Sequence, residues 1–359
     1  MQTFTSSLPW IQRRIRLISI LGSGLMSFWC HDGYAQLDAG VVFLRIQPNV
    51  RSQGMGGASV ALAENALPQA TNPAALAFHK KFSFYAGGGE WLPDFNLGLS
   101  YYCGGIAGHI ENFGTVGLAV RRLSFGEYFR HDRFGNELHS FNSYDLAITG
   151  SFGLDIGQHF AVGFGTSIIR SRLADMGAGS ELSSASATAV AFDMGLLIHD
   201  IGSQLTIAPA WDEIGWLGIP HTRGLTFGIA LQNIGPDINY SEAEQSDPLP
   251  RNLAVGVSYR PVDLEGFGLT LAADINHSLV RSDSYSSGAI INAGVEISLA
   301  RVIELRGGYI HDEIGEIKTP TLGVALGPER YRLECSYIPE SEDMPLSRTT
   351  LFSLIVRLE

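Results

Sequence analysis

The chain has 359 residues, of which 45% are hydrophobic and only 17% are charged, and its formal net charge is −12. Soluble globular domains usually have about 25% charged residues, and the negative charge argues against nucleic acid as a partner. No run of about 18 apolar residues follows residue 35, so a membrane-spanning protein of this composition would have to be a closed β-barrel.

The first 35 residues have the pattern of a signal peptide. Three arginines within residues 13–16 precede an apolar run over 17–29. Gly33 and Ala35 then supply the small residues that signal peptidase requires, which predicts cleavage after Ala35. The alternative, a short membrane anchor, is disfavoured because the apolar run is too short to span a bilayer. We therefore expect an exported protein.

Residues 36–80 lack the alternation of a strand and are rich in Gly and Ala, which predicts turns and short helical pieces. A segment of this kind before a complete barrel is expected to lie in the lumen as a plug. Asn72 should cap or turn the chain before Pro73, because a residue that precedes proline is driven out of the helical region. The alternative is that these two residues only end a linker. The residues expected to form the plug motif are Gly54, Gly56, Gly57, Asn72 and Pro73.

Residues 81–359 show repeated runs of period-two alternation separated by turn residues, the pattern of β-strands. These runs predict an all-β fold, a transmembrane antiparallel β-barrel of about 14 strands, an even number as in bacterial single-chain barrels. The predicted strands are 81–90, 95–107, 113–125, 141–155, 158–171, 186–199, 223–234, 250–261, 266–277, 289–299, 301–310, 317–327, 329–338 and 348–359.

The connections between these runs alternate between short and long, as expected for periplasmic turns and extracellular loops. One connection breaks this rule, because 200–222 is long and falls on the periplasmic side. It is either an insertion or a missed hairpin around residues 204–210.

The two faces of the predicted strands differ in side-chain size. Phe227 and Ile229 alternate with Gly228 and Ala230 within 223–234, and the other runs repeat this contrast. A face of large apolar residues suits lipid, whereas a face of small and polar residues suits a lumen. Aromatic residues near strand ends are expected to form the interface girdles, namely Phe113, Phe125, Tyr144, Phe160, Tyr259 and Tyr337. On the lumen face, Glu304 and Arg306 are placed where they can pair. A soluble all-β protein is the alternative reading.

The loop predicted at 126–140 combines aromatic and basic residues, the types enriched at the centres of protein interfaces. We expect it to lie outside the cell and to bind protein. The alternative is an aromatic girdle followed by a solvated loop. The candidate binding residues are Tyr128, Phe129, Arg130, Arg133 and Phe134.

Several segments, in order along the chain, resemble the PorV/PorQ family within the FadL-like outer-membrane barrels. They begin with "FLRIQPNVRSQGMGGASVA" and "TNPAALA" in the N-terminal segment. Further resemblance lies in "WLPDFNLGLSYY", "RRLSFGEYFRHDRFGNELHSF", "LQNIGPDINYSE", "LPRNLAVGVSY", "LRGGYI" and the closing "PLSRTTLFSLIVRL". The pieces "LSFGEYF" and "NIGPDINY" favour the PorV branch. The chain departs from the family in its long 200–222 connection and in ending at Glu359 instead of an aromatic residue.

The resemblance implies a non-enzymatic outer-membrane component of the type IX secretion system. Proteins of this family bind the C-terminal signal domain of secreted cargo and carry it from the translocon to the sortase complex that attaches it to the cell surface. The implied partners are outer-membrane lipid, the translocon barrel, the sortase and cargo C-terminal domains. No cofactor is implied.

The residues themselves indicate no catalytic, cofactor or metal site. The ten histidines show no metal-ligand spacing, and the glycine clusters lack the remaining residues of nucleotide-binding motifs. His131 and His139 are expected to be solvated, and Cys103 and Cys335 lie in predicted strands. A FadL-like channel for hydrophobic small molecules and a purely structural barrel remain as alternative functions.

Overall fold

A computed structural model describes residues 39–358 except 65, 132–133, 135–136, 158, 175–184, 202–222, 241–245, 265, 281–288, 314 and 341–345. The predicted signal peptide, Arg133 and nearly all of the 200–222 connection lie outside the described residues. The missed hairpin considered at 204–210 therefore stays untested.

The helices of the described residues are short, and all but one precede the first strand. Their bounds are η1 Val42–Arg45, α2 Val50–Gly54, η2 Pro68–Ala70, η3 Pro73–Phe78 and η4 Pro93–Phe95. Within the described part of the chain, no helix has both the length and the apolar character needed to cross a membrane.

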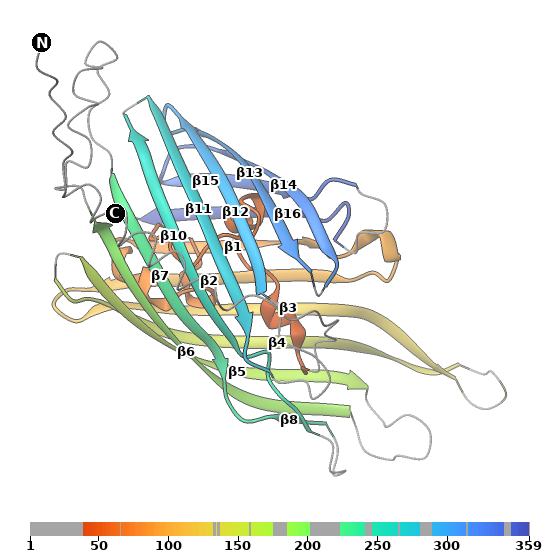
Figure 1. Ribbon diagram of the computed structural model, residues 1–359. Helices are drawn as coiled ribbons and strands as arrows, with labels where there is room; N and C mark the ends of the chain where they lie inside the picture. The colour runs from red at the N-terminus through yellow and green to blue at the C-terminus, as the bar shows by residue number, and fades with distance from the viewer. Residues whose placement is uncertain are drawn as a thin grey trace, which may run out of the picture.

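Fourteen of the described strands close into an antiparallel barrel in which each strand pairs with its neighbours along the chain and β1 pairs with β16 (Figure 1). The barrel strands are β1 Phe82–Glu90, β2 Ser100–Ile110, β3 Gly114–His131, β4 Glu137–Asp155, β5 Phe160–Ala174, β6 Ala185–Ile201, β7 Arg223–Ile234, β10 Asn252–Asp263, β11 Phe267–Ser278, β12 Ala289–Leu299, β13 Ile303–Asp312, β14 Ile317–Leu326, β15 Tyr331–Tyr337 and β16 Thr350–Leu358. The remaining two, β8 Ile238–Asn239 and β9 Ser246–Asp247, form a separate small hairpin.

The barrel confirms the predicted fold class and strand number, and it corrects two local predictions. The stretch 126–140 is mostly strand and not a loop, because the ladder between β3 and β4 continues past a bulge at Gly126. Aromatic stacking of Tyr128 on Phe141, with ring centroids 5.9 Å apart, supports this extension. The strand predicted from 95 begins only at Ser100, because η4 occupies Pro93–Phe95.

The alternation of large and small side chains places the large ones outside, as predicted. In β5, Phe164 and Ile168 are more than half exposed, whereas Ala161 and Ser167 are fully buried inside; Ile169, which is buried in the interior cluster, is an exception. Phe125 is an exception among the predicted girdle residues, because it packs against the interior cluster. The bulge between Ser124 and Gly126 marks where the regular alternation of β3 ends.

The two ends of the barrel follow from the lengths of its connections. The chain enters at β1 and leaves at β16 from the same end, where the links between β2 and β3, β4 and β5, and β12 and β13 are short. We refer to this as the periplasmic end and to the opposite end, with the longer links, as the outer end. An outer-membrane barrel with both strand termini in the periplasm has this arrangement.

Candidate functional site

The N-terminal segment, residues 39–80, packs against the inner side of the barrel wall (Figure 1). Its main chain accepts hydrogen bonds from inward-facing side chains of several strands, so the segment is attached to the wall at several points along its length. Ser258 donates to Ala61 O at 2.9 Å, Gln232 donates to Thr71 O at 2.6 Å, and Thr115 donates to His79 O at 3.1 Å. That the segment closes the lumen as a plug remains a prediction.

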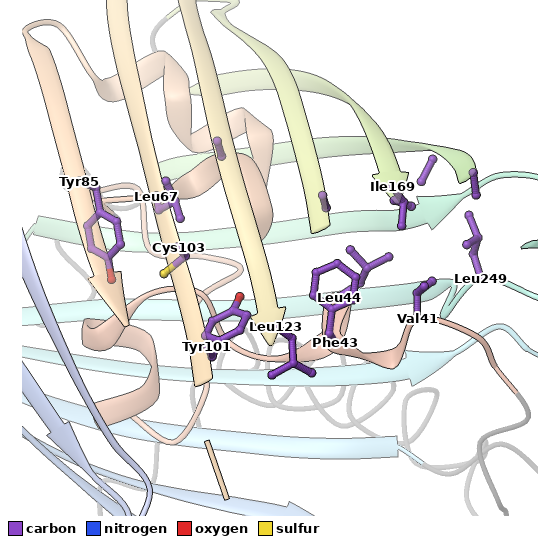
Figure 2. Close-up of a cluster of buried hydrophobic side chains, with 14 of the residues drawn as sticks. Val41, Phe43, Leu44, Leu67, Tyr85, Tyr101, Cys103, Leu123, Ile169 and Leu249 are labelled. Carbon is purple, nitrogen blue, oxygen red and sulfur yellow. The ribbon is translucent and has the colours of Figure 1, made fainter. Parts of the chain in front are cut away.

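An apolar cluster joins the start of this segment to the wall. Figure 2 shows Phe43 and Leu44 pointing toward side chains of the strands, with Leu123 and Tyr101 close to them. Phe43 is 1% exposed. Arg121 of β3 donates to Leu44 O at 3.0 Å, which satisfies a carbonyl that would otherwise be buried without a partner. The cluster anchors η1 near the outer half of the barrel.

The glycine motif lies where the segment touches the strand backbones. Gly56 has φ +70°, and a Cβ there would lie 2.5 Å from both Ala293 O and Tyr309 N. Gly57 has φ +88°, and Gly54 faces the backbone of Gly323 on β14. Thr321 accepts from Gly56 N at 2.8 Å and donates to Gly54 O at 3.1 Å. The motif therefore serves close backbone approach to the wall.

Asn72 is the N-cap of η3 and precedes Pro73 at the first position of that helix. Its Oδ1 accepts from Ala74 N at 3.1 Å, and its Nδ2 donates to Val60 O at 2.8 Å and to Leu196 O at 3.3 Å. One fully buried amide thus holds three chain segments together. Gly195 of β6 leaves room for it, because a Cβ there would lie 2.0 Å from Asn72 Oδ1.

A buried ion network holds α2 against β12, β13 and β15. Arg51 donates to both carboxylate oxygens of Glu296, at 2.8 and 2.6 Å. Arg306 contacts Glu296 at 2.8 Å, Glu334 at 2.9 Å and Glu304. Arg332 pairs with Glu304 and balances the charge of the group. Three arginines therefore face three glutamates inside the barrel.

This arrangement stabilises the charged form of the Arg51 guanidinium. Burial by itself would lower the pKa of the guanidinium, but the facing carboxylate of Glu296 and the hydrogen bonds to it outweigh that effect and raise the pKa. The bidentate geometry is the strong form of a guanidinium–carboxylate contact. Arg51 is therefore a permanently charged anchor of the N-terminal segment.

Two cavities flank the segment along the barrel axis. The periplasmic one, about 380 Å³, is lined mainly by charged side chains, among them Arg51, Arg260 and Glu329. The outer one, about 270 Å³, is lined largely by apolar residues and by carboxamides such as Asn252. Asn252 donates to Gln232 and Asn276, but its own Oδ1 has no partner in the described residues.

The extended part of β3 and β4 forms a two-stranded hairpin that projects beyond its neighbours (Figure 1). The ladder of β2 ends at Ser124, and that of β5 reaches β4 only from Tyr144. Tyr128, Phe129 and Phe134 are 44%, 51% and 75% exposed. Arg130 is in β3, so four of the five predicted binding residues lie on or at the tip of this hairpin.

The described residues contain no group of three or more His, Cys, Asp or Glu that could hold a metal ion. Both cysteines of the barrel are free thiols, and Cys103 donates to Pro48 O at 2.7 Å. His159 and His199 lie close together at the periplasmic end, with ring centroids 6.1 Å apart.

The sequence predictions missed most of the residues that fix the N-terminal segment. Arg51, Glu296, Glu334 and Asp274 are all at most 8% exposed. Asp274 accepts from Ser59 N and Val60 N at 2.5 and 2.9 Å. The sequence signal that could have identified the three acidic residues is their lumen-facing position on predicted strands. A buried carboxylate needs a cation or a hydrogen-bond donor beside it, so each of them predicts a partner inside the barrel.

A family model described as "Type IX secretion system protein PorV" matches residues 32–284. No curated protein matches the chain. Among solved structures, the Ralstonia pickettii toluene transporter TbuX is similar, at 12% identity and a TM-score of 0.50, over 87% of this chain and 98% of that one. The P. putida toluene transporter TodX is similar at 11% identity and a TM-score of 0.51, over the same shares. At these identities the two likenesses concern the fold alone.

Proposed function

Because the chain belongs to the PorV family of type IX secretion system proteins, we propose that it binds the C-terminal signal domain of secreted cargo and carries it to the surface attachment complex. The protein is an outer-membrane β-barrel and a component of a transport or secretion system. In this proposal it acts without catalysis or a cofactor, and it passes between the translocon barrel, which releases cargo, and the sortase, which attaches it.

The observation that carries this proposal is the projecting hairpin of β3 and β4. Its aromatic side chains lie beyond the ring of strands, and within the described residues neither of its edges is paired there with β2 or β5. Exposed aromatic residues on a two-stranded ribbon provide apolar contact area that a folded partner domain can bury. We place cargo contact at Tyr128, Phe129, Arg130, Arg133 and Phe134.

Replacing Phe129 and Phe134 by serine is expected to weaken the binding of a purified cargo C-terminal domain by about tenfold or more, the loss typical of interface hot spots. Binding would be measured by surface plasmon resonance on protein in nanodiscs. Tyr331→Ser is the matched control, since it removes an aromatic side chain that is 49% exposed at the periplasmic end. Equal binding by the double variant and the wild type would contradict the proposed contact.

Acidic residues of the outer loops add a steering contribution in this proposal. Asp237, Glu313, Glu316 and Glu340 lie in these loops, and charges of one sign raise the association rate of a partner of opposite sign. Raising the salt concentration from about 0.05 to 0.5 M should therefore slow association while leaving dissociation nearly unchanged. Dissociation should instead respond to the aromatic substitutions.

The outer cavity favours a second candidate function, passage of hydrophobic small molecules. Its lining is largely apolar, and the two similar solved structures are described as toluene transporters. Deletion of the gene separates the candidates. Loss of cargo processing and surface attachment supports the shuttle. Normal attachment together with lost uptake of a hydrophobic solute would instead assign the channel function.

A further inference from the structure

The ladder between β14 and β15 ends before the outer end of β14, and we call this break in the strand pairing the gap. β14 pairs with β13 along its whole length, from Ile317 to Leu326. On its other side it pairs with β15 only over Leu322–Leu326. Within the described residues, the backbone of 317–321 therefore has no strand partner on the β15 side.

Two prolines account for the end of this ladder. If the register continued for two more residues, Pro320 would lie opposite Pro339. Neither residue has an N–H group, so this pair could not exchange the two N–H···O bonds of a hydrogen-bonded pair, which disfavours continuation of the ladder. Beyond Tyr337 the chain instead follows β16, since Ile338 N donates to Thr349 O at 3.0 Å.

The outer cavity lies directly behind this gap. Ile317 lines it from the β14 side, and Ile338 and Leu346 line it from the other side of the gap. Ile46 and Pro48 of the N-terminal segment also contribute to its wall. The cavity, about 270 Å³, has room for one or two apolar side chains. The unpartnered Oδ1 of Asn252, which is 4% exposed, provides a buried acceptor for a donor from an occupant.

The level of the gap along the barrel axis and the charged residues around it indicate which kind of ligand can bind there. Tyr309, the neighbour of Pro320 on β13, and Tyr337 are both exposed on the outer wall, at positions typical of the aromatic girdle. The gap extends outward from that level, where water-soluble partners can reach it. Glu313, Glu316 and Glu340 are exposed around it, with Lys318 as an exposed cation beside them. An acidic rim disfavours anionic lipid and favours a basic ligand.

We propose that this gap is a docking site for an extended, basic polypeptide segment, which places an apolar side chain into the outer cavity and its lysine or arginine side chains on the acidic rim. The prolines limit ladder bonds along β14, so the buried side chain provides the main anchor. This site is separate from the hairpin of β3 and β4, and it does not depend on the cargo-binding role proposed there.

The test uses the full protein in nanodiscs and a fluorescein-labelled synthetic peptide of nine residues in which lysine and isoleucine alternate. Fluorescence anisotropy would measure its affinity. We expect saturable binding that weakens at least about tenfold when the isoleucines are replaced by serine, and similarly when the lysines are replaced by glutamate. Ile317→Trp, which adds volume to the cavity lining, should also weaken binding about tenfold, and so should Glu313→Gln combined with Glu316→Gln.

Two controls locate the binding. Glu127→Gln removes an exposed acid of the hairpin and should leave the affinity unchanged, as should the Phe129 and Phe134 double variant. The proposal is overturned if the peptide does not bind, if Ile317→Trp binds it as the wild type does, or if Glu127→Gln weakens binding as much as the rim variant. It would also be overturned if maleimide labelled Ile317→Cys at the same rate with and without a saturating concentration of peptide.

Discussion

Substituting Gly56 by alanine is expected to unseat the N-terminal segment and to open a conducting path through the barrel. The residue has φ +70°, which costs a non-glycine residue about 1–2 kcal/mol. The added Cβ would also overlap backbone atoms of Ala293 and Tyr309, which cannot rotate away. Overpacking of this kind costs about 1–3 kcal/mol more. A combined loss near 3 kcal/mol would raise the unseated population roughly 100-fold.

Single-channel recording in planar bilayers would detect this change as an increase in conductance, and trypsin digestion would show new cleavage within residues 39–80. Gly157→Ala is the matched control. Gly157 also has a positive φ, +100°, but nothing lies within 4 Å of the position of its Cβ. If both variants behave as the wild type does, the segment does not close the lumen and the plug prediction is wrong.

Arg51→Met is expected to lower the free energy of unfolding by about 3–5 kcal/mol, the usual result of removing one partner of a buried ion pair. Among the described residues, the variant leaves Arg306 as the one cation in contact with Glu296, whose side chain is buried. Urea unfolding of the protein in lipid vesicles, followed by tryptophan fluorescence, would measure the loss. Combining Arg51→Met with Glu296→Met should recover part of it, because the unpaired carboxylate is then absent.

Arg260→Met provides the comparison for this experiment. Arg260 contacts Glu64 at 3.4 Å, but the two side chains are 22% and 53% exposed. An exposed pair of this kind contributes about 0–1 kcal/mol. A loss for Arg51→Met no larger than that for Arg260→Met would mean that apolar packing and main-chain hydrogen bonds, and not the ion network, hold the segment in place.

The sequence was sufficient to predict the strands and the faces of the barrel. Alternation with a period of two is a local property, so each run shows which of its residues share a face. The absence of helical spans then left a closed barrel as the membrane architecture. Glu304 and Arg306, two residues apart on one strand, could be paired from the sequence because no other element was needed.

The sequence could not show which residues of different elements lie side by side, because that depends on the register between strands. Arg51, Glu296 and Glu334 are far apart in the chain, and only the ladders of β12 to β15 bring them to one level of the lumen. The projecting hairpin also escaped prediction, because a bulge at Gly126 lets its ladder continue where the alternation breaks.

Both prolines beside the gap are visible in the sequence, but neither alone predicts an opening, because a proline at the end of one strand is common. The gap becomes apparent only from the register, which if continued past Leu322 and Tyr337 would set Pro320 against Pro339. The sequence by itself therefore determined which residues face lipid or lumen, since that follows from alternation along each strand. The tertiary structure alone decided which of them meet, since the relative shift of neighbouring strands is set by packing and hydrogen bonding across the whole barrel.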